Sequence, residues 1–406
     1  MKQASPFRKS ISFAVVAGVF LSVSACSLPR KPVPLERLHE ARLLGFPAVR
    51  SWGDRYGAHF HTDLVESVRQ EGDYFSSSCE GYRIYNALAL SGGGPNGAFG
   101  AGFMSGWKKA GTRPEFKIVT GISAGALMAP FVFAGPEFEQ RLGLFTTMGT
   151  MDLLGITGPI SPLWSESLAE AVPLARLLKQ YIDDELLAAI ANAHNHGRRL
   201  YIGTTNIDAE ELVVWNMGAI AASGHPEAPK IFRRVMRASA AIPGAFPPVY
   251  FDVEVEGKMY DELHIDGGVT REVFLYGFIS ELDAAAQELD GKRPANKHSV
   301  YVIINSKLAA SPKQVTPDLV GLIPRAVLSL VKANTLGDLY RIHAVAQRDN
   351  VDFNYVFIPD DYVPKEKEPF DPKEMKRLFD LGFNMAVSGY EWHKIPPGLE
   401  KGRIGQ

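Results

Sequence analysis

Short runs of β-branched and apolar residues alternate with longer helical patterns from Tyr82 onward. This alternation is typical of an α/β fold, in which helices connect the strands of one sheet. The C-terminal part, from about residue 291, continues the alternation, and we expect it to complete the same sheet. The pattern predicts strands near 85–91, 116–120, 199–206, 211–216, 249–256, 299–305 and 352–358. It predicts helices near 97–110, 123–135, 164–193, 228–240, 271–290, 318–346 and 372–388.

Composition narrows the class of protein further. The chain has 406 residues, of which 46% are hydrophobic and 22% charged, enough for one large α/β domain or two smaller ones. The formal net charge is −2 with both signs mixed, so no basic stripe points to nucleic acid. Cysteine and histidine show none of the spacings of a zinc site. We therefore expect no nucleic-acid partner, no metal and no cofactor.

The first 26 residues have the pattern of an export signal. Lys2, Arg8 and Lys9 precede an apolar stretch, 11–25, that is too short to cross a bilayer comfortably. The sequence Val-Ser-Ala before Cys26 resembles a bacterial lipobox, which implies cleavage before Cys26 and diacylglyceryl modification of its sulfur. Ordinary cleavage after "SVSA" is the alternative interpretation.

This reading of the N-terminus predicts the domain organisation and the location. We expect a signal peptide over 1–25, a lipidated Cys26 with a tether and N-terminal extension over 26–80, and a globular domain over 81–395. In proteobacterial lipoproteins, a residue other than Asp after the cysteine usually goes with sorting to the outer membrane. Ser27 stands at that position. The expected location is therefore the cell envelope, lipid-anchored, in the outer membrane of a Gram-negative bacterium.

A glycine-rich loop follows the first predicted strand of the globular domain. The stretch "LALSGGGPNGAFGAGF", 88–103, contains G-x-G-x-x-G at Gly92, Gly94 and Gly97. A dinucleotide fold would add an acidic residue at the end of the second strand, but Glu115 precedes that strand. The Lys and Ser/Thr of a P-loop are missing as well. The glycines therefore more plausibly present N–H groups to an oxyanion.

A second loop joins the next strand to a helix of small residues. It reads Gly121-Ile-Ser123-Ala-Gly125, which is G-x-S-x-G at a strand–turn–helix junction. Its glycines permit the strained turn that lifts a serine hydroxyl off the sheet, and the helix points its N-terminus at that hydroxyl. The loop is predicted to be a nucleophile elbow.

Four motifs in order resemble the patatin-like phospholipases. They are the "GGGPNG" loop, the "GISAG" elbow, "ASAAIPGAFPPV" at 238–249 and "DGG" at 266–268, and the resemblance covers about 85–290. The resemblance implies a three-layer α/β/α fold with a mainly parallel central sheet, and makes 81–395 the catalytic domain. It also implies a Ser–Asp dyad that hydrolyses acyl esters of lipids without a metal.

Carried over to this chain, the resemblance makes Ser123 the nucleophile and Asp266 the base. It makes Gly92, Gly93 and Gly94 the oxyanion hole. One departure is visible, because many family members carry Arg or Lys where this chain has Asn96. The expected substrate is a phospholipid or another acyl-ester lipid, cleaved by a phospholipase A or lysophospholipase activity. An esterase on soluble or non-phospholipid esters, and a non-catalytic lipid-binding envelope lipoprotein, remain alternatives.

Aspartate is a weak base in water, with a pKa of roughly 3.9, so Asp266 would need burial to accept the serine proton. A Ser–Asp–His triad with His298, His343 or His393 is the competing design, but none of these lies in a glycine-marked strand-end loop. We read His264 as an edge or packing histidine. Ser239 lies in a helical pattern without an elbow, so a structural role is expected for it.

Overall fold

The computed structural model describes residues 30–53, 58–72, 84–149, 173–275, 277–290, 298–366 and 368–399. The predicted signal peptide and Cys26 lie outside these ranges. No helix within them is long and apolar enough to cross a membrane.

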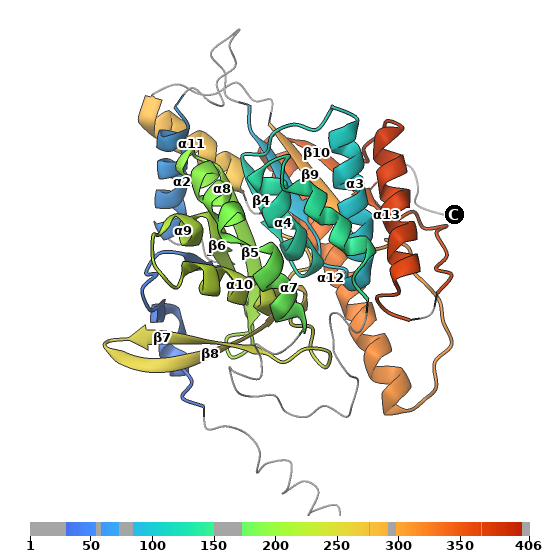
Figure 1. The fold of residues 1–406 in the computed structure, drawn as a ribbon, viewed down its shortest axis with the longest axis horizontal. Coiled ribbons are helices and arrows are strands. Elements are labelled where there is room, and N and C mark those ends of the chain that lie inside the picture. Colours follow the sequence, from blue (N-terminus) through green and yellow to red (C-terminus); the bar gives the residue numbers. More distant parts are fainter. Residues whose placement is uncertain are drawn as a thin grey trace, which may run out of the picture.

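A ten-stranded sheet forms the centre of the molecule (Figure 1). Its order is β1-β7-β8-β5-β4-β3-β9-β10, and β6 pairs with both β5 and β2. The five strands from β5 to β10 are parallel to one another, and the remaining pairings are antiparallel. The strands are β1 (Arg42–Leu43), β2 (Arg50–Trp52), β3 (Asn86–Leu90), β4 (Ile118–Gly121), β5 (Arg199–Asn206), β6 (Glu211–Asn216), β7 (Val249–Val255), β8 (Lys258–Asp266), β9 (Ser299–Ile304) and β10 (Asp352–Phe357).

Helices cover both faces of the sheet. The α-helices are α2 (Ala58–Glu71), α3 (Gly97–Lys109), α4 (Ala124–Ala134), α7 (Pro173–Tyr181), α8 (Asp184–Asn195), α9 (Met217–Ala222), α10 (Ala228–Ser239), α11 (Phe278–Asp290), α12 (Leu319–Arg348) and α13 (Pro372–Val387). Short 3₁₀ helices are η1 (Leu35–Glu40), η2 (Gly94–Asn96), η3 (Glu139–Thr146) and η4 (Gly267–Val269).

Alternate residues of the parallel strands face the two helical layers. In β3, Leu88 and Leu90 pack in the core beneath α3, α4, α8, α10 and α13. Ala87 and Ala89 pack in the opposite core, beneath α2, α11 and the C-terminal half of α12. The three-layer α/β/α fold that the family resemblance implies is thus confirmed.

The register of β8 brings its end to the elbow. Gly121, the last residue of β4, pairs with Ile202 of β5, and Asp266 of β8 pairs with Thr204. Because β6 pairs with one edge of β5 over these residues, β4 and β8 both pair with the other edge of β5, one after the other along the strand. The end of β8 therefore lies just beyond the end of β4.

Two predicted helices have different bounds in the structure. The segment 271–275 is not helical, and α11 begins at Phe278, because Asp338 Oδ2 accepts the N–H groups of Glu272 and Val273 at 2.8 and 3.3 Å. The helix expected over 164–193 ends at Tyr181, and α8 restarts after Asp183, whose side chain caps Leu186 N–H. Residues 164–172 lie outside the described part. The predicted strands omitted β1, β2 and β8, and the predicted helices omitted α2 and α9.

Candidate active site

The elbow between β4 and α4 holds Ser123 in a strained conformation. Its φ of +50° lies in the region that L-residues rarely adopt, as a nucleophile elbow requires. The flanking glycines allow the backbone to pass very close to its neighbours. A Cβ on Gly121 would lie 2.7 Å from Gly125 O, and one on Gly125 would lie 2.2 Å from Leu90 O. Any side chain at position 121 or 125 would therefore clash with neighbouring backbone atoms, so both positions require glycine.

Asp266 meets Ser123 from the end of β8. Ser123 Oγ donates to Asp266 Oδ2 at 2.6 Å, and Gly268 N–H donates to Asp266 Oδ1 at 2.8 Å. Both side chains are buried. The structure thus brings together the two residues that the sequence proposes as nucleophile and base, 143 positions apart.

Burial changes the chemistry of this carboxyl group. Loss of solvation raises the pKa of Asp266 from 3.8 to about 7, although the hydrogen bonds from Ser123 and Gly268 act in the opposite direction. A carboxylate with a pKa near neutrality can accept the proton of an attacking hydroxyl at physiological pH.

The glycine loop after β3 differs in part from expectation. Gly92 N–H donates to the carbonyl of Glu272 at 2.9 Å, so it is not available to an oxyanion. Gly93 and Gly94 have φ values of +145° and +54°, conformations that favour glycine. Gly94 also lines the pocket at Ser123. The donors that remain from the predicted set are the N–H groups of Gly93 and Gly94.

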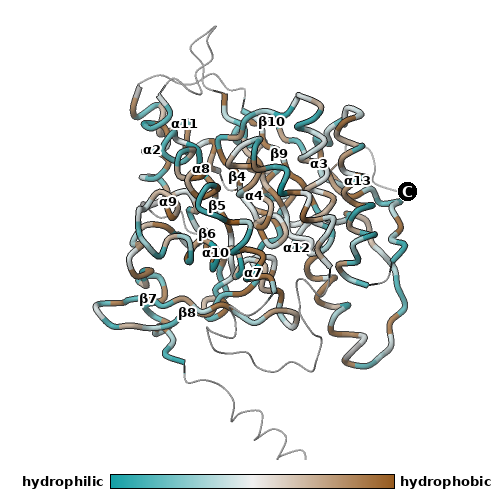
Figure 2. The backbone as a smooth tube through the Cα atoms, in the orientation of Figure 1, coloured by the Kyte–Doolittle hydropathy of each residue, from teal (hydrophilic) through white to brown (hydrophobic). Residues whose placement is uncertain are grey.

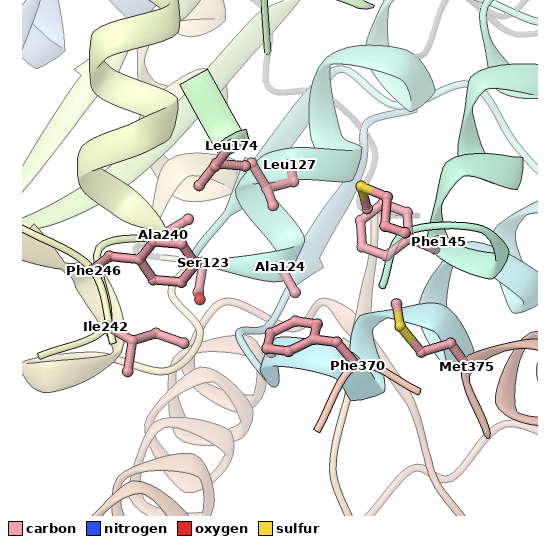
Figure 3. Close-up of a pocket in the computed structure, with 12 residues that line it drawn as sticks. Ser123, Ala124, Leu127, Phe145, Leu174, Ala240, Ile242, Phe246, Phe370 and Met375 are labelled. Atoms are coloured by element: carbon pink, nitrogen blue, oxygen red, sulfur yellow. The ribbon is translucent and has the colours of Figure 1, made fainter. Parts of the chain in front are cut away.

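An apolar pocket opens beside Ser123 (Figure 3). The Ser123 hydroxyl points into the space bounded by Ile242, Phe246 and Phe370. The other lining side chains come from α4, η3, α7, α10 and α13 or from residues next to them: Ala124, Leu127, Phe145, Met148, Leu174, Ala240 and Met375. This lining fits a hydrocarbon chain better than a polar substituent.

Ser239 holds the elbow in place from α10. Its Oγ accepts the N–H of Ser123 at 3.0 Å and donates to Gly203 O at 2.6 Å. The structural role expected for Ser239 is thus a direct contact with the backbone of the elbow. Its position in the "ASAAIPGAFPPV" motif is the only sequence signal for this contact.

Glu272 is a second buried acid at the site, and sequence reasoning missed it. Its carboxyl group fills the space that a Cβ on Gly92 would enter, 2.2 Å from Oε2, and it also borders Gly268. Burial, together with Asp266 and Asp338, raises the pKa of Glu272 well above 4.5. Burial thus favours the neutral form of Glu272, which packs between the glycine loop and the turn after Asp266. No motif in the sequence marks it.

The histidines of the competing triad have other partners. His298 contacts Asp283 and accepts Tyr85 N–H, His343 packs against Phe353, and His393 packs against Tyr355. His264 is fully buried inside the sheet, where it bonds Thr204 Oγ1 and Glu262.

Metal ligands do not gather anywhere in the described ranges, where no three His, Cys, Asp or Glu side chains could hold an ion together.

Part of the chain matches a known protein family. A model of the family described as patatin-like phospholipase matches residues 88–279. No curated protein sequence matches the chain.

Two solved structures are similar to the chain at low sequence identity. VipD from Legionella pneumophila is 12% identical, with a TM-score of 0.37, over 77% of this chain and 69% of that chain. A chain of the SpcU–ExoU complex from the type III secretion system of Pseudomonas aeruginosa is 16% identical, with a TM-score of 0.35. That match covers 75% of this chain and 52% of the other.

Proposed function

Since residues 88–279 form a domain of the patatin-like phospholipase family, we propose that the chain hydrolyses acyl esters of lipids through a dyad of Ser123 and Asp266. The family supports hydrolysis of lipid esters in general. The finer proposal is a phospholipase A or lysophospholipase activity. The observation that supports the Ser–Asp dyad is the 2.6 Å hydrogen bond from buried, strained Ser123 to Asp266, a carboxyl group whose pKa is raised by burial.

The first half of the reaction forms an acyl-enzyme. Ser123 Oγ attacks the ester carbonyl while Asp266 takes its proton. The negative charge that develops on the carbonyl oxygen is stabilised by the N–H groups of Gly93 and Gly94 and by the N-terminus of α4. Donors of this kind are typically worth about 3 kcal/mol each in the transition state. Protonated Asp266 then gives its proton to the leaving alcohol, and the tetrahedral intermediate collapses.

The second half releases the fatty acid. The leaving alcohol vacates its position, and a water molecule enters beside Asp266. Asp266 takes a proton from this water, whose oxygen attacks the acyl carbonyl, and returns the proton to Ser123 Oγ. The apolar pocket holds the acyl chain throughout, so that the same oxyanion donors serve both steps.

We propose that lipidation of Cys26 anchors the protein in the cell envelope, in the outer membrane of a Gram-negative bacterium. The lipobox-like sequence before Cys26 supports this proposal. Metabolic labelling with a radioactive fatty acid, compared between wild type and Cys26→Ala, tests it. Label that persists in Cys26→Ala would refute the anchor.

The catalytic proposal is tested with a fluorophosphonate probe and with fatty-acid release from phosphatidylcholine. We expect wild-type protein to react in both assays. Ser123→Ala should lose both signals completely. Asp266→Asn should lower fatty-acid release by about 10²–10⁴-fold, the usual contribution of a general base.

His343→Gln is a matched control. It removes a candidate base of the competing triad, and His343 packs against Phe353 rather than against Ser123 or Asp266. It should keep both signals. A folded wild-type protein that neither reacts with the probe nor releases fatty acid would refute the proposal. Loss of activity in His343→Gln would instead support the triad.

A further inference from the structure

The N-terminal half of α12 projects from the body of the molecule at the edge of the sheet that carries Ser123 (Figure 1). This half carries large apolar side chains that are exposed, among them Leu319 at 73%, Ile323 at 56% and Leu330 at 67%. Figure 2 shows hydrophobic residues along this outer end of the helix. The part of the chain that matches the family ends at residue 279, so α12 lies outside it.

The apolar side chains form one stripe. Residues 319, 322, 323, 326, 327 and 330 follow the spacing i, i+3, i+4, i+7, i+8, i+11, which places them on one face of a helix. We call Leu319, Leu322, Ile323, Ala326, Val327 and Leu330 the α12 stripe. All six are exposed.

Two polar side chains on the opposite side of the same helix contact the preceding segment, and Leu328 on that side is exposed. Arg325 donates to Ser311 O at 2.7 Å, and Lys332 Nζ donates to Ala309 O. These bonds hold the preceding segment against the back of the helix. The α12 stripe therefore faces away from this preceding segment.

The stripe lies next to the candidate site. Directly after it, Asn334 Nδ2 donates to Val269 O at 3.4 Å, and Asp338 holds Glu272 N–H. Both partners belong to the segment that follows Asp266. Further round the same edge, Arg30 pairs at 2.6 Å with Asp208, in the turn after β5.

The charge of this region is complementary to an anionic lipid surface. Residues 307–332 contain four cations, Lys307, Lys313, Arg325 and Lys332, and one acid, Asp318. A second acid, Asp360, accepts the N–H of Ala309 and lies beside them, so the region keeps a positive balance. A helix with an apolar face and flanking cations binds at the boundary between head groups and acyl chains. Such binding would place the mouth of the apolar pocket at the lipid surface.

We propose that the α12 stripe inserts into an anionic lipid bilayer and presents the candidate site to its lipids. The role that we give to this insertion, presenting lipids to the candidate site, rests on the proposed function. The insertion itself can be measured without catalysis.

Leu330 and Leu328 offer a matched pair for the test. They are the same residue type with similar exposure, 67% and 61%, but they lie about 160° apart around the helix axis. Leu330→Trp and Leu328→Trp are each prepared in the full chain. Their emission, with the parent spectrum subtracted, is measured on vesicles of phosphatidylglycerol and dibromo-phosphatidylcholine. We expect the bromolipid to quench Leu330→Trp and to leave Leu328→Trp nearly unchanged.

Catalysis is measured separately with Leu330→Gln and Leu328→Gln. Leu330→Gln should lower hydrolysis of vesicle lipid about tenfold, because one aliphatic side chain no longer enters the bilayer. It should leave hydrolysis of a soluble short-chain ester unchanged. Leu328→Gln should leave both rates unchanged.

The outcomes separate the two proposals. Absence of hydrolysis of either substrate, with Leu330→Trp still quenched, would refute the proposed function and leave the insertion standing. Equal quenching of both tryptophans, or none, would overturn the insertion. Sedimentation in which Leu330→Gln converts a dimer to a monomer, without bromolipid quenching, would show that the stripe binds a second copy of the chain instead.

Discussion

Replacing the buried carboxyl group of Asp266 with an amide should stabilise the protein in a pH-dependent manner. Asp266→Asn keeps the size of the side chain. Its amide oxygen can accept the N–H of Gly268, and its NH₂ group can donate to Ser123 Oγ. What the substitution removes is a group that must ionise in a site from which water is excluded.

The magnitude follows from the pKa. Burial raises the pKa of Asp266 from 3.8 to about 7, so the folded protein binds a proton more tightly than the unfolded chain. Stability from this group is fully present below pH 3.8 and is lost as pH rises through 7. The full shift corresponds to about 4 kcal/mol at about 1.4 kcal/mol per unit. Wild type should therefore lose up to about this much relative to Asp266→Asn between pH 4 and pH 8.

Urea unfolding of both proteins at several pH values between 4 and 8 measures this difference. We expect the free energy of unfolding of Asp266→Asn to exceed that of wild type increasingly as pH rises, and the gap to level off above pH 7. The activity of wild type on a soluble ester should fall about tenfold per pH unit below 7, because protonated Asp266 is not a base. A stability gap that stays constant from pH 4 to pH 8 would refute the argument from burial.

Three further substitutions test the surroundings of the dyad. Glu272→Gln should change activity at pH 7 by less than about threefold, since burial favours the neutral form of this acid. Wild type should lose stability relative to Glu272→Gln as pH rises above the ordinary glutamate pKa of 4.5, measured by urea unfolding. Ser239→Ala should cost about 2–3 kcal/mol in the free energy of unfolding and lower kcat, because the Ser123 N–H loses its acceptor; an unchanged melting temperature would contradict this. Gly93→Ala should cost about 2 kcal/mol or more, because its Cβ would lie 2.4 Å from Asn305 O at a φ of +145°; thermal unfolding followed by circular dichroism measures the loss.

Elements with a local signature were predictable from the sequence. The bounds predicted for β5 and β6 agree with the structure, because two apolar runs flank a tight turn at 207–210. The strand β8 was missed, because "KMYDELHID" contains too many charged residues to look like a buried strand. Glu262 is nevertheless buried, because it pairs with Arg50 of β2, which is 212 positions away, and also contacts His264.

In the candidate site too, local features could be predicted from the sequence, and contacts between distant segments could not. The strained turn at Ser123 could be placed from its flanking glycines, because a turn is a local structure. The pairing with Asp266 depended on the family resemblance, since it arises from the register of β8 against β5. Glu272 and its contact with the glycine loop could not be foreseen, because they require Asp338 of α12 to hold the segment after Asp266 in an extended form.

The environment at the end of β8 favours a carboxylate over an imidazole as the base. His264 and Asp266 lie two positions apart on the same strand, and both are buried. Burial disfavours whichever form carries the charge, so it lowers the pKa of His264 and raises that of Asp266 to about 7. A buried histidine here becomes a weaker base, whereas a buried aspartate becomes a stronger one. The burial that an apolar acyl-chain pocket would provide therefore strengthens the base of the proposed Ser–Asp dyad. The cost of the ionised carboxylate in stability is a direct consequence of that strength.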